Sequence, residues 1–146
     1  MSRYTTTQAS QNARFAEPAG SMNGAIAKQI LESASLKVID AFQSGAPGNS
    51  AVVLSFVAPV AMTFKAGLAE SAAVAGTAAT AEAIFNLSTD GGATWGTITF
   101  AAAGTVGTFA AAADEEVAAG SLVELTAPAL ADATLADIAI SLGGKA

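Results

Sequence analysis

Carboxylates are the side chains of this sequence that are numerous enough to support acid–base chemistry or to bind a metal ion. The chain of 146 residues has twelve Asp and Glu, six Lys and Arg, and neither His nor Cys. Without imidazole and thiol groups it lacks the usual zinc ligands, a thiolate nucleophile and any disulfide. These absences exclude most common hydrolase mechanisms. The sequence therefore predicts a protein that is not an enzyme, with no catalytic residues, no cofactor and no metal site.

The densest acidic cluster is Asp114-Glu115-Glu116. Hard cations prefer carboxylate oxygens, so this run could hold a cation. A solvated acidic loop is the commoner meaning of such a run, and we adopt that interpretation. A glycosidase would need two carboxylates facing each other across a cleft, and twelve scattered acids do not single out such a pair.

Residues 88–95 read Ser-Thr-Asp-Gly-Gly-Ala-Thr-Trp. The Asp90 carboxylate can accept N–H bonds across a turn, Gly91 or Gly92 can adopt positive φ, and Trp95 can pack its ring against the hairpin. The pattern resembles the Asp-box hairpin of sialidase-like propellers. The resemblance implies a turn and no activity, because sialidase catalysis relies on an arginine cluster and several blades, whereas this chain has two arginines and one box. We interpret Ser88, Asp90, Gly92 and Trp95 as a structural turn, in preference to a sugar or calcium site.

Charge is unevenly distributed along the chain, which has a net charge of -6. Residues 1–45 hold four basic and three acidic groups, whereas residues 46–146 hold two basic and nine acidic groups. An acidic surface repels phosphate backbones, so the sequence predicts no nucleic-acid partner. Arg3, Arg14 and Lys28 are candidate docking contacts for an acidic partner, and ordinary solvated charges explain them equally well.

Neither secretion nor membrane insertion is expected from the sequence. The first residues are polar and lack an apolar stretch of signal-peptide length. The longest apolar run, residues 51–64, is interrupted by Ser55, Pro59 and Thr63. It is shorter than the roughly 20 residues of a membrane helix, so it predicts buried strands.

The first third of the chain differs in pattern from the rest. Residues 1–20 are rich in Ser, Thr, Gln and Asn without periodicity, which is typical of an arm ordered by a partner. Apolar residues from Ile26 to Ala34 recur at three- and four-residue spacing and predict a short helix. Residues 35–43 fit either a continuation of that helix or a strand. The Gly- and Pro-containing residues 44–50 predict a linker between an arm of residues 1–45 and a β module of residues 51–146.

The remainder of the chain predicts a mainly β fold. Two β-favouring runs, residues 82–88 and 94–100, flank a Gly-rich turn and form the clearest hairpin. Further short runs occur at residues 51–57, 60–65, 106–109, 122–126 and 135–142. Seven or more short strands separated by Gly or Pro turns predict a β-sandwich or jelly-roll-like domain, preceded by the N-terminal arm with its short helix.

Two longer segments, residues 85–109 and 118–144, resemble a β module of phage and prophage structural proteins, and three runs within them carry the resemblance. Residues 96–104 read Gly-Thr-Ile-Thr-Phe-Ala-Ala-Ala-Gly, residues 118–128 read Ala-Ala-Gly-Ser-Leu-Val-Glu-Leu-Thr-Ala-Pro, and residues 132–138 read Asp-Ala-Thr-Leu-Ala-Asp-Ile. Segments of these types recur in that family, and the resemblance, which begins at Phe85, covers about 60 of the 146 residues. The Asp usual after Ala-Ala-Gly is Ser121 here, which puts any role of that acid in doubt.

In that family the module occurs in head decoration, head-fibre and tail-associated proteins, often as homotrimers. The resemblance implies a virion protein, assembled in the host cytoplasm, whose partners are its own copies and the major capsid protein or other virion proteins. We expect a capsid decoration or cement protein that stabilises the outer capsid surface. The alternative is a tail- or head-fibre-associated protein that binds a host-surface glycan. The numerous Ala, Gly, Ser and Thr side chains favour close packing of β subunits.

Overall fold

Two antiparallel β-sheets packed against each other make up the described part of the chain. The computed structural model describes residues 35–146, so the arm expected at residues 1–20 and the helix expected up to residue 34 lie outside the described residues. Ten strands and one short 3-10 segment, Ala66–Leu68, are the elements of this part. The prediction of a mainly β, sandwich-like fold is confirmed.

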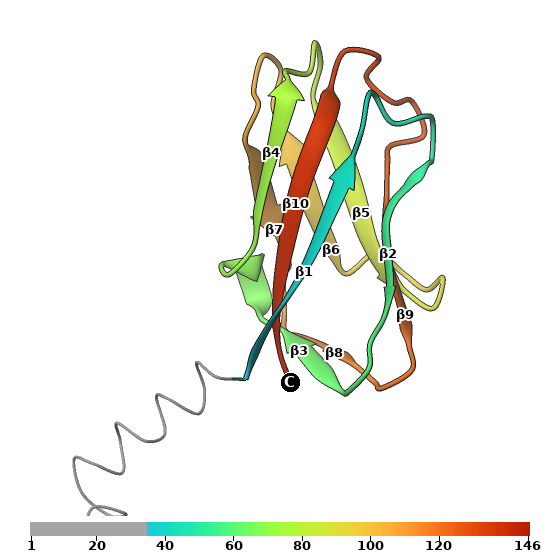
Figure 1. Cartoon of the computed structure of the whole chain (residues 1–146), viewed down its shortest axis with the longest axis vertical. Coiled ribbons are helices and arrows are strands. Elements are labelled where there is room, and N and C mark those ends of the chain that lie inside the picture. The colour runs from blue at the N-terminus through green and yellow to red at the C-terminus, as the bar shows by residue number, and fades with distance from the viewer. Residues whose placement is uncertain (1–34) are drawn as a thin grey trace, which may run out of the picture. The chain divides into compact units, whose positions relative to one another are not determined.

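Sheet A has the strand order β1, β10, β3, β8, and β4 also pairs with β10. Figure 1 shows β4, β10 and β1 along one face of the domain. Strand β10 is the centre of this sheet, because it pairs with β4 from Ala136↔Thr77 to Ser141↔Ala72 and with β3 at its far end. The strand bounds are Leu36–Gln43 (β1), Met62–Phe64 (β3), Ala72–Thr77 (β4), Glu115–Val117 (β8) and Ala136–Lys145 (β10).

Sheet B has the strand order β2, β9, β5, β6, β7. Strands β5 and β6 pair from Ala83↔Phe100 to Leu87↔Gly96, which confirms the hairpin predicted at residues 82–100. The strand bounds are Val52–Val57 (β2), Ala83–Thr89 (β5), Gly96–Phe100 (β6), Gly107–Ala110 (β7) and Leu122–Thr126 (β9).

The core lies between the two sheets and follows from alternation along the strands. In β5 and β6 every second residue is buried, as expected when successive side chains point to opposite faces. Among the described residues no polar or charged side chain is buried. The largest fully buried side chains come from both sheets and from the loops between them: Phe64, Phe85, Phe100, Leu68, Leu87, Ile98, Leu125, Leu135, Ile138, Leu142, Val117 and Val123.

Residues 36–43, left open between helix and strand by the sequence, form strand β1. Ile39 and Ala41 pack against the core, and the Ser141 hydroxyl of β10 donates a hydrogen bond to Asp40. Residues Lys37–Ala146 form one compact unit, so the β domain begins well before residue 51, where the sequence placed its start. Residues 44–50 connect strands within this domain: Ser50 N–H, for example, donates to the Pro128 carbonyl at 3.0 Å.

The end of β10 needs glycine because other groups approach its backbone closely. A Cβ atom at Gly143 would clash with the carbonyl oxygen of Glu70, and one at Gly144 would lie 2.8 Å from Cε1 of Phe64. Because both positions lack a side chain, the backbone of Glu70 and the ring of Phe64 can lie directly against the strand. Side chains at these two positions would displace Glu70 and Phe64 from the end of β10.

We expect the Phe85→Ala substitution to lower the free energy of unfolding by about 3–5 kcal/mol, because it opens a cavity in the core. Phe85 is 1% exposed and meets the Phe100 ring edge-on at a centroid distance of 5.9 Å. Its neighbour Ile84 is 40% exposed, so Ile84→Ala is a matched control expected to cost about 1 kcal/mol or less. Urea unfolding of both variants measures the difference, and equal losses would contradict the assigned faces of β5.

Candidate functional site

The turn between β5 and β6 is built on Asp90 and Gly91. Their φ angles are 51° and 69°, and Gly92 N–H donates to the Thr89 carbonyl at 2.9 Å. Two consecutive residues with positive φ closed by this bond are the mark of a type I′ turn, for which Asp-Gly is a preferred sequence. The prediction of positive φ at Gly91 or Gly92 is confirmed at Gly91.

The Asp90 carboxylate accepts a hydrogen bond from a neighbouring strand, whereas the sequence suggested bonds across its own turn. Leu122 N–H donates to Asp90 Oδ1 at 2.8 Å, and Asp90 N–H donates to the Leu122 carbonyl at 2.8 Å. Two hydrogen bonds hold the pKa of Asp90 below its usual value. The bond from Leu122 N–H has the larger effect, and the bond from the Ser121 side chain has the smaller one. The turn is thereby tied to the start of β9. A carboxylate at position 121 would bring a second negative charge beside Asp90.

Trp95 connects the same hairpin to sheet A. Its ring stacks on Phe64 of β3, with a centroid distance of 5.3 Å and an interplanar angle of 26°. Its Nε1–H donates to Thr89 Oγ1 at 3.0 Å, which fixes the ring relative to the turn. Ser88 is half-buried and lies opposite Glu124 of β9. The structure therefore brings Ser88, Asp90, Gly92 and Trp95 into one turn region, from which Asp90 and Trp95 reach other strands.

A shallow groove of about 530 Å³ opens beside Trp95. Trp95 and Phe109, both half-buried, supply aromatic surface to it, and Thr94 and Thr97 supply hydroxyl groups. No charged residue is among the described residues that line it. Aromatic surface combined with a few neutral hydrogen-bonding groups suits an uncharged ligand with both apolar and hydroxyl faces, such as a neutral sugar.

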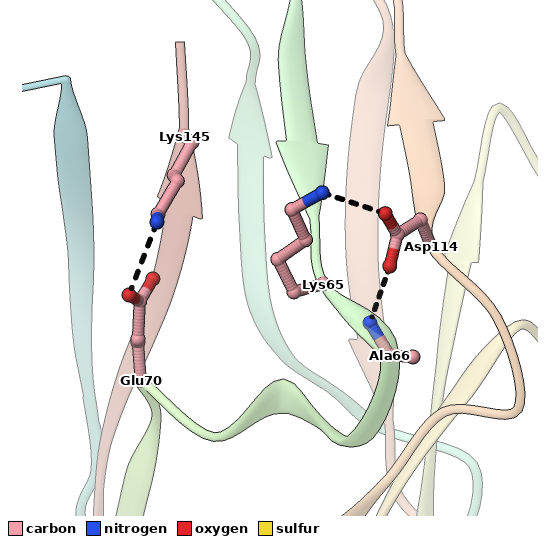
Figure 2. Close-up of polar contacts among 5 residues, drawn as sticks. All are labelled: Lys65, Ala66, Glu70, Asp114 and Lys145. Atoms are coloured by element: carbon pink, nitrogen blue, oxygen red, sulfur yellow. Dashed lines mark hydrogen bonds and ion pairs between the residues drawn. The ribbon is translucent and has the colours of Figure 1, made fainter. Parts of the chain in front are cut away.

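A second hollow, of about 580 Å³, lies where β3, β8 and the end of β10 meet. Lys65 and Lys145 line it, and Figure 2 shows that each has an acidic partner. Lys65 Nζ lies 2.7 Å from Asp114 Oδ2, and Lys145 Nζ lies 3.6 Å from Glu70 Oε1. Both pairs are partly exposed, so each stabilises the fold only weakly. Because both ammonium groups are paired, this hollow offers no free cation to an anionic ligand.

The acidic run 114–116 is divided among different roles. Asp114 is bound by Lys65 and by the Ala66 N–H at 2.8 Å, and these bonds, the first being the larger, hold its pKa below the usual value. The same bond to Asp114 raises the pKa of Lys65. Glu115 and Glu116 are consecutive residues of β8, so they point to opposite faces of the strand. In residues 35–146 no three acidic side chains gather closely enough to hold a metal ion.

Asp132 accepts more hydrogen bonds than the other acids described above, and the sequence did not single it out. Its Oδ2 accepts Thr80 N–H, Thr80 Oγ1–H and Ala81 N–H at 2.6–2.9 Å. Its Oδ1 accepts Thr134 N–H, Thr134 Oγ1–H and Leu135 N–H at 2.7–3.0 Å. These bonds, that of the Thr80 hydroxyl being the largest cause, hold the pKa of Asp132 far below its usual value. Asp132 thus joins the loop before β5 to the loop before β10.

The sequence contains only a local signal for the hydrogen bonds of Asp132. Asp132-Ala133-Thr134 has the spacing of a turn in which an Asp side chain binds the backbone two residues later. The partners at residues 80 and 81 lie about fifty positions away in the chain. No local pattern indicates such a pairing.

The remaining predicted site residues, Arg3, Arg14 and Lys28, lie outside the described residues. Comparison with known proteins shows no match to a family model and no significant match to a curated protein. Within residues 35–146, no helix is long and apolar enough to cross a membrane.

We expect Asp132→Asn to lower the midpoint of urea unfolding at neutral pH, because the charged acceptor of six hydrogen bonds becomes a neutral amide. A folded-state pKa below the unfolded value stabilises the fold above the unfolded pKa, and this stabilisation is lost as pH falls through the folded pKa. The difference in urea midpoint between wild type and variant should therefore be constant around neutral pH and should decrease below about pH 4. Glu82→Gln, at a nearby exposed carboxylate, is the control. A gap that is independent of pH down to acid unfolding would contradict this role.

Proposed function

We propose that this chain is a non-enzymatic structural subunit of a bacteriophage particle, and that it decorates or cements the outer capsid surface. On this proposal the protein is located in the virion. Its partners are its own copies, assembled as a homotrimer, and the major capsid protein. Neither nucleic acid nor a membrane is required as a partner.

The observation that carries this proposal is the position of the resembling segments in the fold. Residues 85–109 contain most of β5 together with β6 and β7, and residues 118–144 contain β9 and nearly all of β10. Strands β9, β5, β6 and β7 are consecutive neighbours in sheet B, and β10 is the centre of sheet A. The likeness therefore covers four consecutive strands of sheet B and the central strand of sheet A rather than scattered low-complexity matches, which supports relating it to a folded phage module.

The use of charged groups supports a structural role. Asp90, Asp114, Asp132 and Asp137 each accept a hydrogen bond from the backbone of another segment. Carboxylates engaged in this way hold loops in place. The sequence also offers no His or Cys with which they could form a catalytic group. A subunit of this kind stabilises a particle through modest contacts repeated at many copies.

We expect removal of residues 2–20 to leave the β domain folded and to abolish binding to the particle, because the proposal assigns attachment to the N-terminal arm with Arg3 and Arg14. The measurement is sedimentation of the tagged truncated chain with particles of a phage that encodes it, together with a circular dichroism spectrum and a melting curve. The full-length tagged chain is the positive control. Normal incorporation of the truncated chain would contradict attachment through the arm.

The groove beside Trp95 favours a second candidate function, binding of a neutral host-surface glycan by a fibre-associated protein. The Trp95 ring is already held by Phe64 and by Thr89, so a ligand that packs on it would not need to order it. The groove lacks charged lining, which favours a neutral over an acidic sugar.

If this second function holds, a glycan array should give hits with neutral sugars, and Thr97→Val should weaken binding about fivefold, the effect of losing one hydrogen bond. Phe109→Leu should also weaken binding, because it removes aromatic surface while keeping an apolar residue against the core. Thr108→Val, at an exposed threonine of β7 outside the groove lining, is the matched control. An array without hits would count against this function and would leave the structural one untouched.

A further inference from the structure

Asp90 is the only aspartate in the sequence that is followed by glycine. An Asp side chain carries an electrophilic carbon, Cγ, close to the backbone nitrogen of the next residue, and these two atoms can close a five-membered ring. A side chain on the next residue hinders that closure, and glycine has none. The other four Asp residues are followed by Ala, Glu or Ile. Asp90-Gly91 is therefore the Asp linkage of this chain that is most prone to rearrangement.

The surroundings of this linkage are open to water. Asp90, Gly91 and Gly92 are all exposed in the turn between β5 and β6. A Cβ atom built on Gly91 would meet no atom within 4 Å apart from its own chain neighbours. Water, the only co-reactant that the rearrangement needs, thus has free access to Gly91.

The rearrangement begins when the Gly91 nitrogen attacks Cγ of the protonated Asp90 carboxyl group. The N–Cγ bond forms, the Cγ–OH bond breaks, and the hydroxyl leaves as water with the amide hydrogen, which gives a cyclic imide. Hydrolysis then consumes one water. Opening at the carbonyl that derives from the Asp90 backbone breaks its bond to nitrogen, so the chain now runs through Cβ and Cγ as an isoaspartyl linkage. Opening at the other carbonyl restores Asp90.

The fold opposes the first step of this reaction. Asp90 Oδ1 accepts Leu122 N–H at 2.8 Å, and Asp90 N–H donates to the Leu122 carbonyl at 2.8 Å. This pair of bonds holds the carboxylate toward β9, and it must open before Cγ can turn toward the Gly91 nitrogen. The bonds from Leu122 N–H and from the Ser121 side chain also lower the pKa of Asp90. Less of the carboxyl is then protonated, which is the form that can lose water.

We propose that Asp90-Gly91 is a site of spontaneous isoaspartate formation, which the contact with Leu122 holds closed in the folded domain. Rearrangement then occurs from the minority of molecules in which this contact has opened, so its rate reports the opening of the hairpin from β9. The proposal concerns the turn itself and is independent of the partners with which the chain assembles.

Rearrangement at Asp90 alters the surroundings of Trp95. The isoaspartyl linkage adds one carbon to the backbone, and a two-residue type I′ turn cannot keep its geometry with a longer chain. Thr89, whose hydroxyl accepts Trp95 Nε1–H at 3.0 Å, directly precedes Asp90. Trp95 also lines the groove described above. A slow chemical change in the turn therefore loosens the ring and deforms the groove.

Incubation of the full chain at neutral pH, folded in buffer and unfolded in guanidinium chloride, tests the site. Peptide mapping with electron-transfer fragmentation gives the rate of isoaspartate formation at each Asp. In the unfolded chain the rate at Asp90 should exceed that at Asp132 about tenfold or more, because Ala133 hinders ring closure. In the folded chain the rate at Asp90 should be about tenfold lower or less than in the unfolded chain, since only opened molecules react.

Ser121→Ala tests the contact that holds the site closed. It removes one of the two hydrogen bonds to the Asp90 carboxylate, so it should raise the rate in the folded chain about two- to tenfold. Ser55→Ala, at an exposed serine of β2, is the matched control and should leave the rate unchanged. Circular dichroism verifies that both variants are folded, and neither should change the rate in guanidinium chloride.

Trp95 is the only Trp of the chain, so its fluorescence reports the consequence of the rearrangement. After incubation in guanidinium chloride and refolding, its emission should shift to longer wavelength in proportion to the isoaspartate at Asp90. An unshifted emission would contradict the loosening of the ring. Equal rates at Asp90 in the folded and unfolded chain, or a folded rate unchanged by Ser121→Ala, would overturn the contact with Leu122 as the protection. Isoaspartate no more frequent at Asp90 than at Asp132 in the unfolded chain would overturn the site.

Discussion

The contact between Phe64 and Trp95 is the constraint on which the rest of this domain depends. Phe64 belongs to β3 of sheet A, whereas Trp95 precedes β6 of sheet B, so their stacked rings join the two sheets. Phe56 of β2 meets Phe64 edge-on at 6.4 Å and extends the aromatic contact to the far edge of sheet B. Aromatic pairs contribute beyond the area they bury, and this one also fixes where each sheet ends relative to the other.

Several local features follow from the position of these two rings. Gly144 must lack a side chain because the Phe64 ring lies over it. Lys65 follows Phe64 directly, so its ion pair with Asp114 forms beside the anchored ring. Trp95 follows the turn built on Asp90 and also lines the groove. A single stacked pair thus positions the turn, the groove and the Lys65–Asp114 ion pair, although Phe64 and Trp95 are far apart in the sequence.

Carboxylates take the place that disulfides or metal ions occupy in other small β domains. The chain has no Cys and no His, yet its loops are long enough to need ties. Asp132 alone joins two loops through six hydrogen bonds, and Asp90 joins the β5–β6 turn to β9. A carboxylate is well suited to this work because it accepts several N–H and O–H bonds at once. Part of the acidic composition therefore has a structural explanation.

The sequence predicted those features of the fold that depend on residues close together in the chain. The β5–β6 hairpin was predictable because alternation and a Gly-rich turn are local signals. Residues 36–43 were not, because their spacing fits both a helix and a strand, and pairing with the distant strand β10 makes them a strand. The partners of Asp90 and Asp132 were missed for the same reason. Alternation in β1 also does not tell which of Ile39 and Phe42 is buried, since that depends on the side from which the second sheet packs.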